Sequence, residues 1–421
     1  MDLFTITSII IVLSALFGYL NVRFLKLPNT IGLMLVAIIF TLILFASTFI
    51  DKSIYEIAEN MISKIPFSEI LMDVMLGFLL FAGAMHTNFD QLRVQRWPIL
   101  IFSTLGVLAS TFITGGLVFY LLQFMGFEVP FIHCLLFGAL ISPTDPIAVL
   151  GILKKAGVPK KLETKIVGES LFNDGVGVVV FLTILGIAQG GPHGSGDPFD
   201  VAKLFGQEVF GGLVMGGLLG YGTYLLMKSI DDYDIEILIT LACVMGGYSL
   251  AHYLHLSAPL AMVVAGLVVG NEKVRGSSMS DITEQYVDKF WELVDMLMNA
   301  ILFVLIGLEM LILTFNGQYV LAGLISIVLV LLARYISLFI PVKLFSKKLE
   351  FVPHTDKIMT WGGLRGGISI ALALSLPSEM NRDIFIIITY IVVVFSILVQ
   401  GLSIGKLATR LIGKEHMTTH T

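Results

Sequence analysis

Charge is the scarcest property of this 421-residue sequence. Only 14% of the residues are charged, whereas 56% are hydrophobic and the mean hydropathy is +0.92. Soluble proteins carry about 25% charged residues, so a chain with so few could not cover its surface in water. The composition excludes a soluble enzyme. It also excludes a nucleic-acid-binding protein, because a net charge of −5 offers no basic footprint to a phosphate backbone.

The sequence has only two cysteines and lacks a nucleotide-binding loop. Cys134 and Cys243 are the only cysteines, and both lie in apolar runs, which excludes a disulfide-stabilised secreted scaffold. The sequence also lacks a loop of the GxxxxGK[ST] kind, so we expect no use of ATP and no cofactor. The composition therefore predicts the lipid bilayer as a partner of this chain.

What the sequence has in abundance is long apolar runs. A membrane-spanning helix needs about 20 mostly apolar residues. The runs are continuous rather than alternating, which excludes a membrane β-barrel. We therefore predict an all-α polytopic membrane protein with thirteen spans, at about 4–21, 29–49, 69–86, 98–124, 130–153, 163–188, 203–228, 234–254, 257–270, 284–314, 319–345, 356–377 and 383–412.

The basic residues are distributed unevenly between the predicted loops. With thirteen spans, 19 of the 26 Lys and Arg residues fall on one side of the membrane. Only Lys52, Lys64, Lys203 and Arg382 fall on the other. By the positive-inside rule the richer side is cytoplasmic. This predicts an N-terminus outside the cell membrane and a cytoplasmic C-terminus.

The chain divides near its middle. A Gly- and Pro-rich linker at 189–200 follows span 6. If span 7 is a connector, spans 1–6 and 8–13 form two six-helix repeats of opposite topology, an arrangement common among secondary transporters.

Span 5 carries an acid between two prolines. Pro143 and Pro146 bracket Thr144 and Asp145. Proline removes a backbone donor and clashes with the preceding turn, so this pair predicts an unwound helix at mid-membrane. Freed carbonyls and the Thr144 hydroxyl are suited to a small cation. The alternative is a plain proline kink capped by Asp145.

Span 6 carries a polar face. Glu169, Ser170, Asn173 and Asp174 share one side of a helix. Two carboxylates in a low dielectric cannot both stay ionised without partners. One needs a cationic partner, which leaves the other to bind either Na⁺ or H⁺. The alternative is a structural polar cluster between helices.

Span 12 is the counterpart of span 5 in the second half. Paired glycines flank Arg365 and predict a second interrupted helix. Two matched interrupted spans indicate a transport site. Arg365 is suited to neutralising the carbonyl ends of broken helices, although a small-residue packing seam is the alternative. Arg334 in span 11 is a candidate partner for one of the span 6 acids.

These residues carry a resemblance to a known family. The strings SPTDP (142–146), GESLFNDG (168–175), FVLIGLE (303–309), LLAR (331–334) and WGGLRGG (361–367) resemble those of the monovalent cation:proton antiporter-1 family. That family includes bacterial NhaP-type antiporters and animal sodium/proton exchangers, and the match runs over nearly the whole chain.

The resemblance implies roles for individual residues. Asp174 would bind Na⁺ and H⁺ in turn, and Thr144, Asp145 and Ser170 would contribute further Na⁺ ligands. Asn173 would belong to the same site and, as Asn rather than Asp, implies electroneutral exchange. Glu169 would pair with Arg334, and Arg365 would stabilise the crossed unwound helices of spans 5 and 12.

The resemblance also implies a homodimer with two kinds of domain. Residues 1–94 and 231–316 would form the dimerisation domain, and residues 95–190 and 317–412 the mobile core. Residues 191–230 would connect them, and 413–421 would be a short cytoplasmic tail. The sequence departs from the family at Ala82, in the string LLFA (79–82), where many members have an acid.

The sequence is compatible with three functional hypotheses. The leading one is Na⁺ or Li⁺ exchange for H⁺ by alternating access. K⁺/H⁺ antiport is the first alternative, because one sequence does not fix the size of the site. A gated cation channel is less favoured, because the sequence lacks a repeated filter loop.

Overall fold

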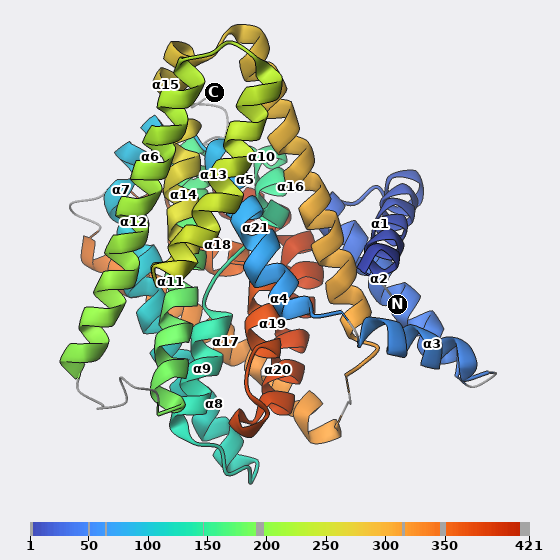
Figure 1. Cartoon of the computed structure of the whole chain (residues 1–421). Coiled ribbons are helices and arrows are strands. Elements are labelled where there is room, and N and C mark those ends of the chain that lie inside the picture. The colour runs from blue at the N-terminus through green and yellow to red at the C-terminus, as the bar shows by residue number, and fades with distance from the viewer. Residues whose placement is uncertain are drawn as a thin grey trace.

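The described part of the chain is all helical (Figure 1). The computed structural model describes residues 3–48, 51–63, 65–145, 147–190, 198–313, 316–345 and 351–412. Most of the predicted linker, the predicted tail and Pro146 lie outside these residues. Within them, the isolated β-bridge is a single pair, Asp145 with Leu364.

The helices before the predicted linker include three π-helical stretches, η1, η2 and η3, and several short helices. They run as α1 (Leu3–Leu20), η1 (Asn21–Leu25), α2 (Asn29–Ser47), α3 (Ser53–Ile62), α4 (Phe67–Glu69), η2 (Ile70–Met75), α5 (Leu76–Met85), α6 (Phe89–Val94), α7 (Arg96–Ile101), η3 (Phe102–Gly106), α8 (Val107–Phe124), α9 (Phe131–Ile141), α10 (Ile147–Lys155) and α11 (Lys160–Ala188).

The helices after it follow a similar pattern. They run as α12 (Pro198–Lys228), α13 (Tyr233–Tyr253), α14 (Ala258–Val269), α15 (Glu272–Ser278), α16 (Asp281–Glu309), α17 (Gly317–Phe345), α18 (Thr355–Gly362), α19 (Gly367–Leu374), η4 (Ser378–Met380), α20 (Arg382–Phe395), η5 (Ser396–Gln400) and α21 (Gly401–Ile412).

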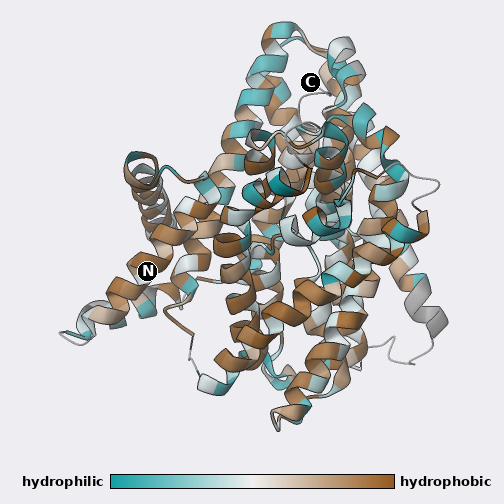
Figure 2. Cartoon of the chain, turned by 180° about the vertical axis from the view of Figure 1, so that it is seen from behind, coloured by the Kyte–Doolittle hydropathy of each residue, from teal (hydrophilic) through white to brown (hydrophobic). Residues whose placement is uncertain are grey.

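Ten helical stretches in the described residues are long and apolar enough to cross a membrane. They fall in ten of the thirteen predicted ranges. The other three ranges hold the short helix α14 and two interrupted pairs, α9 with α10 and α18 with α19. Apolar residues cover the middle of the bundle, and hydrophilic residues gather toward its ends (Figure 2).

Several features were not predicted from the sequence. The helices α3, α6 and α15 lie where we predicted loops. Four spans contain a π-helical stretch, namely η1, η2, η3 and η5. A π-turn depends on how neighbouring helices pack and frequently marks a functional site, so hydropathy alone does not reveal it.

Glycines let α12 approach α14 closely. A Cβ at Gly216 would overlap the carbonyl oxygen of Ala261, and one at Gly220 would lie 2.7 Å from Val268 Cβ. Gly217, the next residue along the helix from Gly216, has nothing within 4 Å of a Cβ. The two helices are therefore joined along one stripe of small residues, as is typical of membrane helix pairs.

This stripe gives a matched test. Gly216→Ala should lower the thermal stability of the purified protein, because overpacking costs about 1–3 kcal/mol. Gly217→Ala changes the intrinsic helix propensity by the same amount but meets open space, so its stability should equal or exceed that of the wild type. Equal melting temperatures for the two variants would contradict the close packing.

Candidate functional site

The two interrupted spans cross and bond to each other. Between α9 and α10 the chain leaves the helix at Ser142, and between α18 and α19 it is non-helical at 363–366. The Asp145 amide donates to the Leu364 carbonyl at 2.8 Å. A Cβ at Gly366 would lie 2.8 Å from Asp145 Cβ, so only glycine allows this approach. The predicted interruptions in both spans are thus observed in the structure.

Other side chains satisfy the backbone groups that the interruptions free. Arg365 is 2% exposed, and its Nη1 donates to the carbonyls of Ser142 and Pro143, at the end of α9. The Arg365 amide donates to Ser396 Oγ at 2.9 Å, and Gln400 Nε2 donates to the Trp361 carbonyl at 2.9 Å. A guanidinium at the carbonyl end of a helix also opposes its partial negative charge.

The polar face of α11 lies against the first unwound segment. Ser170 Oγ and Thr144 Oγ1 are 2.9 Å apart. The Asn173 side-chain amide donates to Thr144 Oγ1 at 2.9 Å and to Glu169 Oε1 at 3.1 Å, and its oxygen accepts from the Thr144 amide at 3.2 Å. Both ends of the Asn173 amide therefore hold the unwound segment against the helix.

Glu169 is paired with Arg334. Arg334 Nη1 and Nη2 donate to the two carboxylate oxygens of Glu169 at 2.6 and 2.7 Å, and both side chains are 2% exposed or less. A bidentate geometry of this kind is the strongest form of ion pair in proteins. It neutralises one of the two carboxylates on the polar face of α11.

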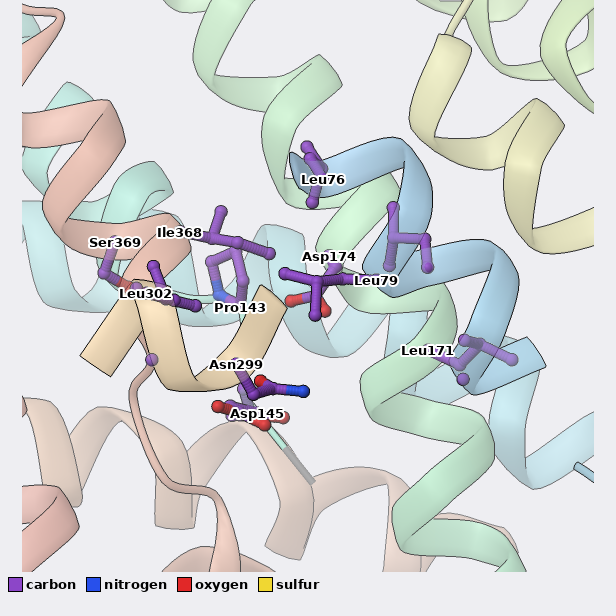
Figure 3. A pocket seen from close by; sticks show the side chains of 15 residues that line it. Leu76, Leu79, Pro143, Asp145, Leu171, Asp174, Asn299, Leu302, Ile368 and Ser369 are labelled. Carbon is purple, nitrogen blue, oxygen red and sulfur yellow. The ribbon is translucent and has the colours of Figure 1, made fainter. Parts of the chain in front are cut away.

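Asp174 is the other carboxylate, and it is left facing a cavity. The cavity has a volume of about 70 Å³ and is lined by Thr144, Asp145 and Asp174, with Leu76 and Leu79 of the third span opposite (Figure 3). Among the described residues, no side chain or amide donates a hydrogen bond to the Asp174 carboxylate. An acid with a cavity before it and no competing donor is available to a small cation or a proton.

Two polar residues at this cavity were not predicted from the sequence. Asn299 of α16 and Ser369 of α19 also line it (Figure 3). Asn299 Nδ2 donates to the carbonyl and the Oδ1 of Asp295 at 2.9 and 3.1 Å. A single Asn in an apolar helix forms no motif with its neighbours. Its position well inside a predicted span was the only indication in the sequence. Ser396 and Gln400 were missed for the same reason.

Ala82 lies away from the cavity. It is fully buried and is not among the residues that line the space before Asp174. The α5 residues that do so are Leu76, Leu79, Leu80 and Gly83. The third span therefore contributes an apolar wall to this space.

Comparison with known proteins decides the family. Residues 11–410 match the family model described as sodium/hydrogen exchanger, transmembrane. The chain belongs to this family. It is therefore an integral membrane transporter and not an enzyme.

Individual relatives cover nearly the full length. The chain is 52% identical to the Na⁺/H⁺ antiporter NhaP of Pseudomonas aeruginosa over 95% of both chains. It is 34% identical to the Na⁺/H⁺ antiporter NhaH of Halobacillus dabanensis, over 92% of this chain and 93% of the relative. The fold is similar to that of the sodium proton antiporter MjNhaP1 of Methanocaldococcus jannaschii, with a TM-score of 0.76 and 21% identity, over 98% of this chain and 100% of that chain.

The buried ion pair gives a prediction for stability. Arg334→Met should destabilise the protein by about 3–5 kcal/mol, because Glu169 would be left buried without a partner. Adding Glu169→Gln to that variant should recover much of the loss. Thermal unfolding of the purified single and double variants measures both effects.

The control is the exposed pair of Lys289 with Glu292, whose atoms lie 2.7 Å apart. Lys289→Met should cost no more than about 1 kcal/mol. An Arg334→Met variant no less stable than Lys289→Met would show that the Glu169 charge is compensated in another way.

Proposed function

We propose that this chain exchanges Na⁺ or Li⁺ for H⁺ across the cell membrane, with Asp174 binding cation and proton in turn. The observation that carries the proposal is the difference between the two acids on the polar face of α11, Glu169 and Asp174. Arg334 compensates Glu169, whereas Asp174 faces a cavity beside two crossed interrupted helices. The names of relatives that match over most of both chains agree with this activity.

The cation would be held by oxygen atoms from both elements. We assign Asp174 and Ser170 of α11, with Thr144 and Asp145 of the unwound segment, as its ligands. Hard cations prefer carboxylate, hydroxyl and carbonyl oxygens, and the hydroxyls of Thr144 and Ser170 already lie 2.9 Å apart. Asn173 supports the site by holding Thr144 in place. A proton on Asp174 would remove the charge that attracts the cation, so the two would compete.

The surrounding architecture would supply alternating access. We propose thirteen spans arranged as two inverted six-helix repeats with α12 as the connector. Residues 95–190 and 317–412 would form a core that moves against a dimerisation domain of residues 1–94 and 231–316. The charge distribution favours an N-terminus outside and a cytoplasmic C-terminus.

Removing the Asp174 charge tests the assignment. Asp174→Asn should abolish proton flux on Na⁺ addition to sealed vesicles, because the amide neither titrates nor attracts a cation. The exposed Asp234→Asn is the control and should exchange at the wild-type rate. Full exchange by Asp174→Asn would refute the proposal. Running Na⁺, Li⁺ and K⁺ in parallel decides between Na⁺/H⁺ and K⁺/H⁺ antiport.

The stoichiometry gives a second test. With Glu169 paired to Arg334 and with Asn rather than Asp at position 173, Asp174 is the one carboxylate left on the polar face of α11 to carry either one monovalent cation or one proton. Exchange should therefore move no net charge. Its rate in vesicles should not change when the membrane potential is clamped at different values with K⁺ and valinomycin. A rate that rises or falls steadily with potential would contradict one-for-one exchange.

A further inference from the structure

A second cavity, larger than the first, lies behind α11. Its volume is about 320 Å³, within the range of about 300–1,000 Å³ that is typical of ligand sites. It touches α11 at Phe172 and Val176, which lie on the face of the helix opposite Asp174 because residues two apart are rotated by about 200°. This cavity is therefore separate from the candidate ion site.

The walls of the cavity are apolar and come from several helices. Leu92 of α6, Ile99 of α7, Leu213 of α12 and Leu260 of α14 all line it. Within the described residues, α12 packs mainly on α14 and α13, with less contact to α11. Residues of α12 and of the α7–η3 segment both line the cavity, which therefore lies between them.

One part of the cavity wall is basic. Arg93 and Arg96 line it and are exposed. Neither forms an ion pair with a described acidic residue. Arg96 instead lies over the ring of Trp97 at 5.8 Å, and Trp97 is 57% exposed. Exposed Trp beside Arg is typical of the membrane–water boundary, so the basic part of the cavity lies at headgroup level.

We propose that this cavity binds one anionic phospholipid. Its phosphate would lie on Arg93 and Arg96, and an acyl chain would fill the apolar space between α12 and α11. A free phosphate would leave the apolar walls uncovered, and a neutral lipid would leave two arginines without a counter-charge. Basic pockets between membrane helices on the cytoplasmic side bind anionic headgroups in this way.

The position of the cavity links the lipid to transport. Its lining joins α7 and α11, which belong to the proposed mobile core, to α12 and α14, which do not. A lipid in this space would contact both sides of the boundary along which the core would move. This link between the lipid and transport rests on the proposed function, whereas binding of the lipid does not.

The binding test uses the full chain, purified and stripped of lipid in detergent. Phosphatidylglycerol and phosphatidylcholine of the same acyl chains are titrated in parallel, and retention is measured by native mass spectrometry and by the shift in melting temperature. One phosphatidylglycerol per chain should be retained in preference to phosphatidylcholine. The double variant Arg93→Gln, Arg96→Gln should bind it about thirtyfold more weakly, since each basic residue near the headgroup strengthens binding about fivefold.

Matched controls separate the site from general charge and bulk. The double variant Arg23→Gln, Lys26→Gln removes two exposed charges from η1 and its C-cap, neither of which lines the cavity, and should bind normally. Leu213→Trp fills the apolar space and should prevent retention, whereas Leu218→Trp, at an exposed position of the same helix, should not. Glycerol 3-phosphate at equal concentration should not compete.

Three outcomes would overturn the proposal. They are equal retention of the two lipids, unchanged affinity in the Arg93→Gln, Arg96→Gln variant, and displacement of the lipid by glycerol 3-phosphate. The same titration on Asp174→Asn should give wild-type binding. A wild-type chain that exchanges ions but does not discriminate between the lipids would refute this site and leave the proposed function intact.

Discussion

The crossing of the two interrupted spans depends on one constraint, that backbone polar groups inside a membrane must find partners within the protein. Each helix break frees amides and carbonyls that water cannot reach. Here the partners are specific: Arg365 for the end of α9, Leu364 for the Asp145 amide, and Asn173 for Thr144. The site exists because these bonds hold an unwound backbone open beside α11.

The charges near the crossing follow from the same requirement. A buried carboxylate is tolerated when it is paired and hydrogen-bonded, and Glu169 meets both conditions through Arg334 and Asn173. Asp174 meets neither within the described residues and faces a cavity instead. The difference between two acids five positions apart on one helix therefore comes from their neighbours, not from their chemistry.

Much of this arrangement was predictable because it rests on residues with strong local effects. Proline at 143 and the two glycine pairs that flank Arg365 weaken a helix, so both interruptions were predicted from the sequence. One glycine pair alone is not enough, since Gly216 and Gly217 lie within the continuous helix α12. The polar face of α11 was equally visible, because an acid in an apolar run has a high insertion cost. The pairing of Glu169 with Arg334 came from family resemblance, since the residues alone offered Arg334 to either acid.

What escaped prediction depends on tertiary packing. Asn299, Ser396 and Gln400 are uncharged and isolated in sequence, and only the fold brings them to the cavity or the crossing. The same holds for the π-helical stretches and for the wall formed by Leu76 and Leu79. Ala82 was matched to an acidic position of the family on the basis of the short string LLFA. In the structure its neighbours on α5, and not Ala82, line the cavity.

The Glu169–Arg334 pair also has a consequence for biosynthesis. The two residues are 165 positions apart, so at about 5–20 residues per second Glu169 is synthesised roughly 8–33 seconds before its partner. During that interval the carboxylate has no guanidinium to bind. The nascent first half must therefore keep the Glu169 carboxylate in contact with water or another polar group until α17 is inserted, which makes insertion of the second half the step that completes the site.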